Sequence, residues 1–216
     1  MKFSSECRRC LRLATFLDEV KTSQPDYFAK PVPSFGTTKP SFLIVGLAPG
    51  MHGANRTGRP FTGDYAGDLL YSTLHTFGFS TSGEPLDSKG NANSGLVLNN
   101  CRITNAVRCL PPQNKPEPDE IKMCNDYLVS ELEDLPQGAA VLALGTIAHQ
   151  AVLRASSLRA KDYKFEHAAE HVLPSGIHFY DSYHCSLYNT QTKRLTTPMF
   201  HSVFKSIKGY LGSAKL

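Results

Sequence analysis

Residues 41–64 read SFLIVGLAPGMHGANRTGRPFTGD, an apolar run that passes directly into a glycine-rich loop and ends on an acid. A short apolar run bounded by glycine is typical of a buried strand in a parallel sheet, which is covered on both faces. The sequence contains four such runs, at residues 42–46, 103–107, 140–144 and 177–183. Helix-like segments separate these runs, and strands that alternate with helices predict an α/β fold. We therefore expect three layers, αβα, around a central four-stranded, mostly parallel sheet.

Apolar residues at helical spacing predict helices at residues 66–79, 116–135, 146–154 and 199–211. Residues 80–95 have no such pattern and are predicted as a surface loop. With 216 residues, 41% of them hydrophobic, the chain can fill one core and is short for two. The expected organisation is a single domain over residues 1–216.

Composition and charge indicate the surroundings in which the chain works. No apolar run approaches the length of about 18 residues that a membrane helix needs, and the opening residues, MKFSSECRRC, do not form a secretory leader. We expect no membrane partner and a cytoplasmic protein, nucleoid-associated in a prokaryote or nuclear in a eukaryote. The net charge is +4, and basic residues gather in loops, which suits a polyanionic partner. We expect the chain to act as a monomer.

The ends of the strands are the places to search for a site. In sheets of this kind the ligand crevice lies at the carboxyl ends of the strands, which here read GLAPG, AVRC, LGT and SYHCS. Two nucleotide-binding motifs fail in the loop that begins with GLAPG. Residues 53–58 have the glycine spacing of a P-loop, but Arg59 and Pro60 follow where a lysine and a hydroxyl are needed. No GxGxxG pattern can be aligned either.

Four of the six cysteines form two groups, Cys7-x2-Cys10 and Cys109-x14-Cys124. In an intracellular chain such groups favour a metal site over disulfides. Four thiolates suit a structural zinc ion or a cubane iron–sulfur cluster, and the spacing alone leaves both open. A zinc deaminase, another enzyme that modifies nucleic-acid bases, is excluded because its HxE and PCxxC pair is missing.

Three segments, GLAPGMHGANRTGRPFTGD, ITNAVRCLPPQNKPEPDEIKMC and SYHCSLYNTQTKRLT, together with the early CRRC, resemble the uracil-DNA glycosylase superfamily. The resemblance is closest to its iron–sulfur family 5, the type b branch, and the three segments span residues 46–196 in order. Two departures stand out. The first loop reads GLAPG where many members have an alanine, and Cys185 follows His184 where the family usually has a proline.

The resemblance implies a monofunctional DNA glycosylase of base excision repair. Such an enzyme hydrolyses the N-glycosidic bond of uracil, and of other deaminated bases, in DNA, with water as the nucleophile. The resemblance also favours a [4Fe–4S] cluster on Cys7, Cys10, Cys109 and Cys124. The alternative is a non-catalytic iron–sulfur module of the same fold that binds nucleic acid. A covalent-trapping relative is not supported, because no inserted basic segment lies beside the HCS motif.

A base inside a duplex must be flipped out into a pocket that stacks on its face and reads its edge. Phe61 is the expected stacking ring, although an aromatic residue under a glycine-rich loop can equally fill the core. Asn105 offers an acceptor and donors, as the edge of uracil requires, although an asparagine after a strand is ordinarily a turn residue. The resemblance favours the binding roles, and adds Gly46, Ala48, Gly50 and His184 as substrate-binding residues.

Cleavage leaves positive charge on the sugar and negative charge on the departing base. Leu47 stands where family 4 members offer an acid, so the first carboxylate available is Asp64. The resemblance assigns Asp64 to the water and the cationic sugar, with Asp68 as second choice, whereas its structural alternative is to cap the next helix. His184 is the expected donor to the leaving base, and a histidine at that place is otherwise a structural one. Asn105 completes the predicted catalytic set.

The remaining polar residues of the two loops are expected to contact DNA, by resemblance and because their types suit phosphate and base edges. The predicted DNA-binding residues are His52, Asn55, Arg56, Arg59, Asn189, Gln191 and Arg194. In this family the loop after the histidine meets the DNA where the base has left. Leu187 or Tyr188 is therefore the candidate wedge, unless the segment is an ordinary solvated loop.

Overall fold

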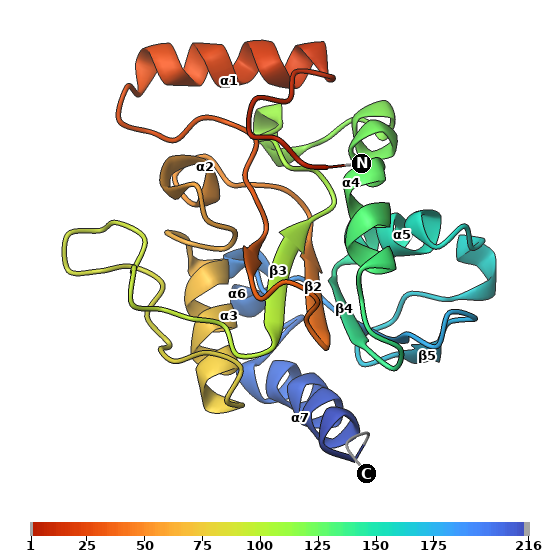
Figure 1. The fold of residues 1–216 in the computed structure, drawn as a ribbon. Helices are drawn as coiled ribbons and strands as arrows, with labels where there is room; N and C mark the ends of the chain where they lie inside the picture. The colour runs from red at the N-terminus through yellow and green to blue at the C-terminus, as the bar shows by residue number, and fades with distance from the viewer. Residues whose placement is uncertain (1, 214–216) are drawn as a thin grey trace.

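The structure, a computed structural model, describes residues 2–213 and contains a six-stranded sheet with helices on both faces (Figure 1). The strands lie in the order β1-β3-β2-β4-β6-β5. The four inner strands are parallel and correspond to the four predicted runs: β3 (Cys101–Asn105), β2 (Phe42–Gly46), β4 (Ala140–Leu144) and β6 (His178–Ser182). The predicted α/β class and three layers are confirmed.

The sheet is wider than the predicted four strands, because an antiparallel strand pairs at each edge. These are β1 (Phe35–Gly36), beside β3, and β5 (Glu170–Val172), beside β6. Two or three residues are too few to show an alternating pattern, so the sequence did not reveal them. The predicted run 103–107 is also shifted: β3 begins at Cys101, which pairs with Phe42, and ends at Asn105, which pairs with Gly46.

All four predicted helices are present: α3 (Tyr65–Thr76), α4 (Pro118–Glu133), α5 (Thr146–Ala155) and α7 (Thr197–Ser213). Five further helical segments were not predicted: α1 (Leu11–Ser23), α2 (Ala54–Thr57), α6 (Leu187–Gln191), η1 (Pro112–Asn114) and η2 (Ala160–Asp162). Apart from α1 they are one turn long, too short for a period to show. Within residues 2–213, no helix has the length and apolar character needed to cross a bilayer.

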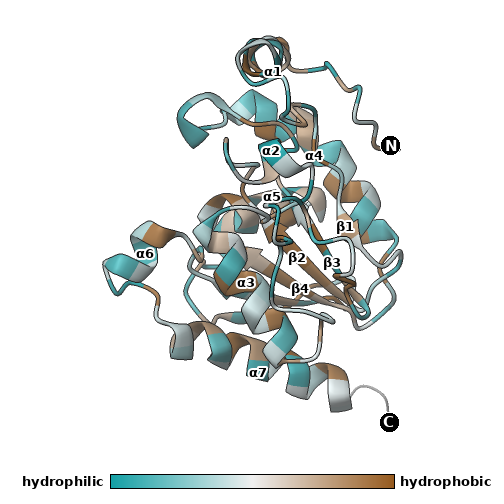
Figure 2. Ribbon diagram, turned by 90° about the vertical axis from the view of Figure 1, so that its left-hand side faces the viewer, coloured by the Kyte–Doolittle hydropathy of each residue, from teal (hydrophilic) through white to brown (hydrophobic). Residues whose placement is uncertain are grey.

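The side chains of β2 divide between two cores. Phe42 and Ile44 point to the face covered by α3 and α7, whereas Leu43 and Val45 point to the face covered by α4 and α5. Such alternation buries both faces, as a central parallel strand requires, and the strands form the brown centre of Figure 2. The edge of the sheet at the strand exits is therefore left for a ligand.

A third apolar cluster lies beyond the carboxyl ends of the strands, where α1 packs on the start of α4. It joins Leu13 and Leu17 of α1 to Cys109, Cys124 and Tyr127. Figure 1 shows α1 as a separate bar across the top of the molecule. The N-terminal segment is thus held against the loop after β3.

Candidate active site

A cavity of about 520 Å³ opens at the carboxyl ends of β2, β3 and β6. Its walls combine apolar backbone with a few polar side chains. It is lined by Leu47, Ala48, Gly50, Ala54, Phe61, Asp64, Tyr65, Ala66, Asn105, Asn114, His184, Ser186 and Leu187. A concave, mostly apolar pocket with a few convergent polar groups is the usual form of a small-molecule site. The structure thus brings together Ala48, Gly50, Phe61, Asp64, Asn105 and His184, all predicted from the sequence.

Phe61 forms one wall through an unusual backbone conformation. Its φ is 52°, in the left-handed region that residues other than glycine seldom adopt. Gly67 allows this turn, because a Cβ at that position would clash with the carbonyl oxygen of Phe61. The Phe61 ring lies nearly parallel to the His184 ring, at 27° and 5.9 Å between centroids. Gly46 leaves room beneath, since a Cβ there would clash with both Phe61 and Asn105.

Asn105 ends β3 and is almost fully buried, with 3% of its surface exposed. Its side-chain oxygen Oδ1 has no hydrogen-bond partner among residues 2–213. A buried polar atom left without a partner costs about 1–3 kcal/mol, so such an atom in the wall of a cavity favours a ligand that donates to it. The predicted edge-reading role of Asn105 has this geometry in its support.

Asp64 is both the cap of α3 and part of the cavity. Its Oδ1 accepts a hydrogen bond of 2.9 Å from the backbone N–H of Gly67. Its Oδ2 lies over Gly50 and Gly53, where a Cβ on Gly53 would meet it at 2.5 Å. Burial raises the pKa of Asp64, and the N–H groups of Gly67 and Ala66 act against that rise. The two interpretations of the sequence, cap and site carboxylate, describe the same side chain.

His184 also lines the cavity and lies just beyond the end of β6. Burial lowers the pKa of His184 to about 4, so the imidazole is neutral at neutral pH. Its Cβ packs near Gly145, at 3.5 Å from the position of a built Cβ. No hydrogen bond fixes the ring atoms of His184 within the part of the chain that the structure describes. The next residue, Cys185, is fully buried and directs its Sγ to the carbonyl oxygen of Ala66 at 3.4 Å.

Sequence reasoning did not name several of the lining residues, and the one among them with a side-chain amide is Asn114, in the loop that follows β3. Gln113 and Asn114 both have positive φ, 56° and 57°, which curls this loop back toward the cavity. Asparagine is the residue other than glycine that adopts this conformation most readily. The run PPQNKP carried that turn signal, but nothing local indicated where the turn would place the amide.

The predicted DNA contacts in the first loop mostly have partners within the protein. Arg56 donates to the carbonyl oxygens of His52 at 2.8 Å and Gly90 at 2.7 Å. Arg59 donates to Asn93 O at 2.7 Å, and burial lowers its pKa. These bonds anchor residues 80–95, so that segment is a surface loop fastened to the site rather than a plain one.

The other predicted DNA contacts of the first loop are Asn55 and His52, and Arg59 also packs on an aromatic ring. The Arg59 guanidinium lies 4.3 Å from the centroid of the Phe35 ring. Asn55 is fully buried, and neither polar atom of its side chain has a partner within residues 2–213. His52 pairs its Nδ1 with the hydroxyl of Tyr27 at 2.8 Å. Of these predicted contacts, the structure places Asn55 away from any surface that DNA could reach.

The second loop, which follows β6 and contains α6, has more exposed side chains. Leu187 and Tyr188 of α6 are 46% and 71% exposed, and Leu187 also lines the cavity. Gln191 is exposed, whereas Asn189 donates from Nδ2 to the carbonyl oxygen of His184 at 2.8 Å. The guanidinium of Arg194 lies 4.7 Å from the centre of the Tyr183 ring. An apolar rim with a nearby cation stands beside the cavity.

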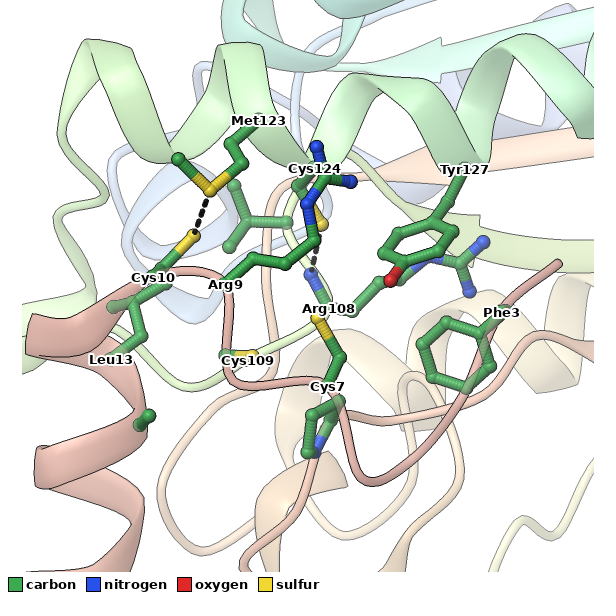
Figure 3. A pocket seen from close by; sticks show the side chains of 13 residues that line it. Phe3, Cys7, Arg9, Cys10, Leu13, Arg108, Cys109, Met123, Cys124 and Tyr127 are labelled. Atoms are coloured by element: carbon green, nitrogen blue, oxygen red, sulfur yellow. Dashed lines mark hydrogen bonds between the residues drawn. The ribbon is translucent and has the colours of Figure 1, made fainter. Parts of the chain in front are cut away.

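The four cysteines of the two sequence groups surround one small cavity (Figure 3). Cys7 and Cys10 precede α1, Cys109 lies in the loop after β3, and Cys124 lies in α4. The side chains of Cys10 and Met123 approach at 3.7 Å between sulfurs, and the backbone N–H of Arg108 donates to Cys124 Sγ at 3.3 Å. Within residues 2–213, no three histidine, cysteine or acidic side chains are close enough together to hold a single metal ion.

The strand ends of this sheet hold a cavity walled by a ring, an amide, an imidazole and a carboxylate, an arrangement that suits an enzyme acting on a planar heterocycle. Residues 33–208 match the family model of the uracil DNA glycosylase superfamily, and the chain belongs to this superfamily.

Relatives of the chain carry type-5 and type-4 names. It is 44% identical to the type-5 uracil-DNA glycosylase of Thermus thermophilus, over 95% of this chain and 94% of the relative. It is 40% identical to that of Mycobacterium bovis, over 96% and 79%. The type-4 enzyme of Archaeoglobus fulgidus is 33% identical over 67% and 57%. The crystal structure of Pedobacter heparinus SMUG2 matches at 14% identity, with a TM-score of 0.44 over 81% and 76%, and the family assignment does not depend on it.

Proposed function

We propose that this chain is a monofunctional uracil-DNA glycosylase of base excision repair, which hydrolyses the bond between deoxyribose and uracil. The observation that carries the proposal is the convergence of Phe61, Asn105, Asp64 and His184 on one cavity. A base can enter such a cavity only after it leaves the stack. The relatives named type-5 uracil-DNA glycosylases support the same reaction.

Recognition of the base rests on Phe61 and Asn105. The Phe61 ring offers a flat wall on which a base can stack, a contact worth about 1–3 kcal/mol. The unpartnered Oδ1 of Asn105 can accept the N3–H of uracil, and its amide N–H₂ can donate to O4. Ala48 and Gly50 line the wall around the base, and Gly46 leaves room beneath Phe61 and Asn105. The purine products of deamination, hypoxanthine and xanthine, fit a cavity of about 520 Å³, and we include them as substrates.

Cleavage uses the two titratable groups on opposite sides of the base. As the N1–C1′ bond breaks, its electron pair leaves with the base, and the sugar becomes cationic. Neutral His184 donates a hydrogen bond to the departing base oxygen, where negative charge collects. Ionised Asp64 stabilises the cationic sugar and orients the water that bonds to C1′. The proton that this water loses passes to Asp64 and then to solvent, and the departing base anion takes up one proton from solvent, which gives neutral uracil. We infer that Asn114, which lines the same cavity, helps to hold that water with its amide.

DNA is the partner that this chemistry requires. We infer that Leu187 or Tyr188, both exposed, fills the gap that the flipped base leaves. Gln191, Arg194 and His52 lie in the two loops beside the cavity and complete the proposed contact surface. We also propose that the chain acts as a monomer. Such an enzyme works in the cytoplasm, with the nucleoid in a prokaryote.

We also propose that Cys7, Cys10, Cys109 and Cys124 hold a [4Fe–4S] cluster. Four thiolates can hold a structural zinc ion or an iron–sulfur cluster, and the resemblance to family 5 favours the cluster. The four cysteines line one cavity, as either group requires. When bound, the cluster supplies a covalent link that fastens the N-terminal segment to α4 and the loop after β3. It lies outside the base cavity and takes no part in the reaction.

Release of free base from uracil-containing DNA tests the function directly. The parent protein is expected to release uracil, hypoxanthine and xanthine, and Asn105→Ala is expected to blunt the ranking among them, because unmade edge hydrogen bonds in a pocket are costly. A parent protein that binds the DNA and releases no base would establish the alternative, a non-catalytic iron–sulfur module. If Asn105→Ala releases the three bases in the same order of preference as the parent protein, Asn105 does not recognise the edge of the base.

A further inference from the structure

The imidazole of His184 depends on its backbone for its position. Within residues 2–213 no hydrogen bond reaches either ring nitrogen, and the nearest ring, Phe61, is 5.9 Å away between centroids. Groups that act at the reacting bond must be held close to their productive geometry by their surroundings. The question is therefore which residues fix the main chain at His184.

Asn189 makes the only side-chain hydrogen bond to the main chain of His184 that the described residues show. Its Nδ2 donates to the His184 carbonyl oxygen at 2.8 Å, within the normal range. Asn189 is itself held: its backbone N–H lies 3.4 Å from the Ser186 hydroxyl, and its carbonyl accepts from Leu195 at 3.0 Å. The side chain is half-buried, and its donor is directed to the main chain of His184.

Helix α6 joins this bond to the surface. Leu187 and Tyr188, the two residues before Asn189, are among the most exposed large apolar side chains of the described chain. Figure 2 shows α6 standing out from the body of the molecule. A short helix with exposed apolar side chains is thus tied, through one amide, to the backbone of the proposed leaving-group donor, His184.

We propose that Asn189 is a positioning residue for base release, which clamps the backbone of His184 to α6, rather than a direct DNA contact. The inference rests on the proposed function and deepens it, because it assigns the second loop a role in the chemical step. A donor displaced by about 1 Å can lose about a hundredfold in rate. The loss of this clamp is accordingly a loss in the chemical step and not in binding.

Two variants of Asn189 and one of Gln191 separate the two roles. Asn189→Ala removes the donor, and Asn189→Asp replaces it with an acceptor that repels the carbonyl. Each is expected to slow single-turnover base release by about 10- to 100-fold, with the Kd for uracil-containing DNA within about twofold of the parent. Gln191→Ala, on the same helix with an exposed amide, is the comparison for a direct DNA contact and is expected to raise the Kd for uracil-containing DNA.

A double-mutant cycle with His184 makes the test independent of folding effects. If Asn189 acts only through the imidazole, Asn189→Ala adds no further loss in a His184→Ala background. A loss of the same size in both backgrounds, or an Asn189→Ala variant that weakens DNA binding with its rate intact, would overturn the inference. Thermal midpoints of all variants are measured alongside. A parent protein that releases no uracil would instead defeat the proposed function.

Discussion

At Asp64 one carboxylate serves two purposes. One oxygen caps α3 through Gly67, and the other lies over Gly50 and Gly53 in the cavity wall. Because the cap holds the side chain, the second oxygen has a fixed direction, which is the condition for electrostatic stabilisation without reorganisation. The sequence places this acid beyond the glycine turn, where the first strand itself delivers only Leu47.

Asp64→Asn separates the two purposes, because asparagine caps helices about as well as aspartate and carries no charge. We expect single-turnover base release to slow by about a hundredfold or more, with the thermal midpoint and DNA affinity near those of the parent. Asp68→Asn is the matched control on the same helix. A parental rate in Asp64→Asn together with a slow Asp68→Asn would transfer the role to Asp68.

The pH dependence of base release follows from two pKa shifts of opposite direction, one at Asp64 and one at His184. Burial raises the pKa of Asp64 and lowers that of His184 to about 4. Since Asp64 must be ionised, the single-turnover rate is expected to fall as the pH drops through a pKa above the ordinary aspartate value of about 3.9. His184 remains neutral above about pH 4 and adds no limb near neutrality. An acid limb near pH 6.5, lost in His184→Ala, would place the titrating group on the imidazole instead.

At the scale of elements, the glycine-rich loop keeps its shape through bonds to a segment some 30 residues further on. Arg56 reaches Gly90, and Arg59 reaches Asn93 while stacking on Phe35. Short loops with many glycines lose much conformational freedom on folding. The two arginines offset that cost by fixing the turn that carries Phe61.

Arg56→Ala tests this anchoring. We expect the free energy of unfolding to drop by about 1.5–3 kcal/mol, the usual range for hydrogen bonds from a charged group. The slope of log K for DNA against log salt is expected to stay at the parental value. Arg154→Ala, an exposed arginine of α5, is the charge-matched control. A slope reduced by about one with stability unchanged would make Arg56 a phosphate contact, as its sequence predicts.

At the scale of the whole molecule, the cysteine cavity connects three segments that the sheet alone does not hold. If it takes a [4Fe–4S] cluster, purified protein is expected to be brown with about four irons per chain. Cys124→Ala is expected to lose the colour and to expose α1 to proteolysis, whereas Cys101→Ala, buried in β3, keeps the colour. A colourless protein with one zinc per chain would reverse the assignment.

The sequence by itself determined the inner sheet and the helices α3, α4, α5 and α7, because apolar periodicity is a local property. The resemblance of its motifs indicated the cavity side chains Phe61, Asp64, Asn105 and His184. The partners of polar side chains were decided only by the tertiary structure. Arg56, Arg59 and Asn189 were assigned to DNA by residue type, yet each donates to a backbone carbonyl that only the folded chain brings near. Asn114 reaches the cavity through two left-handed residues whose direction depends on the strand before them. A hydrogen bond needs its donor and acceptor within about 3 Å, and folding sets that separation.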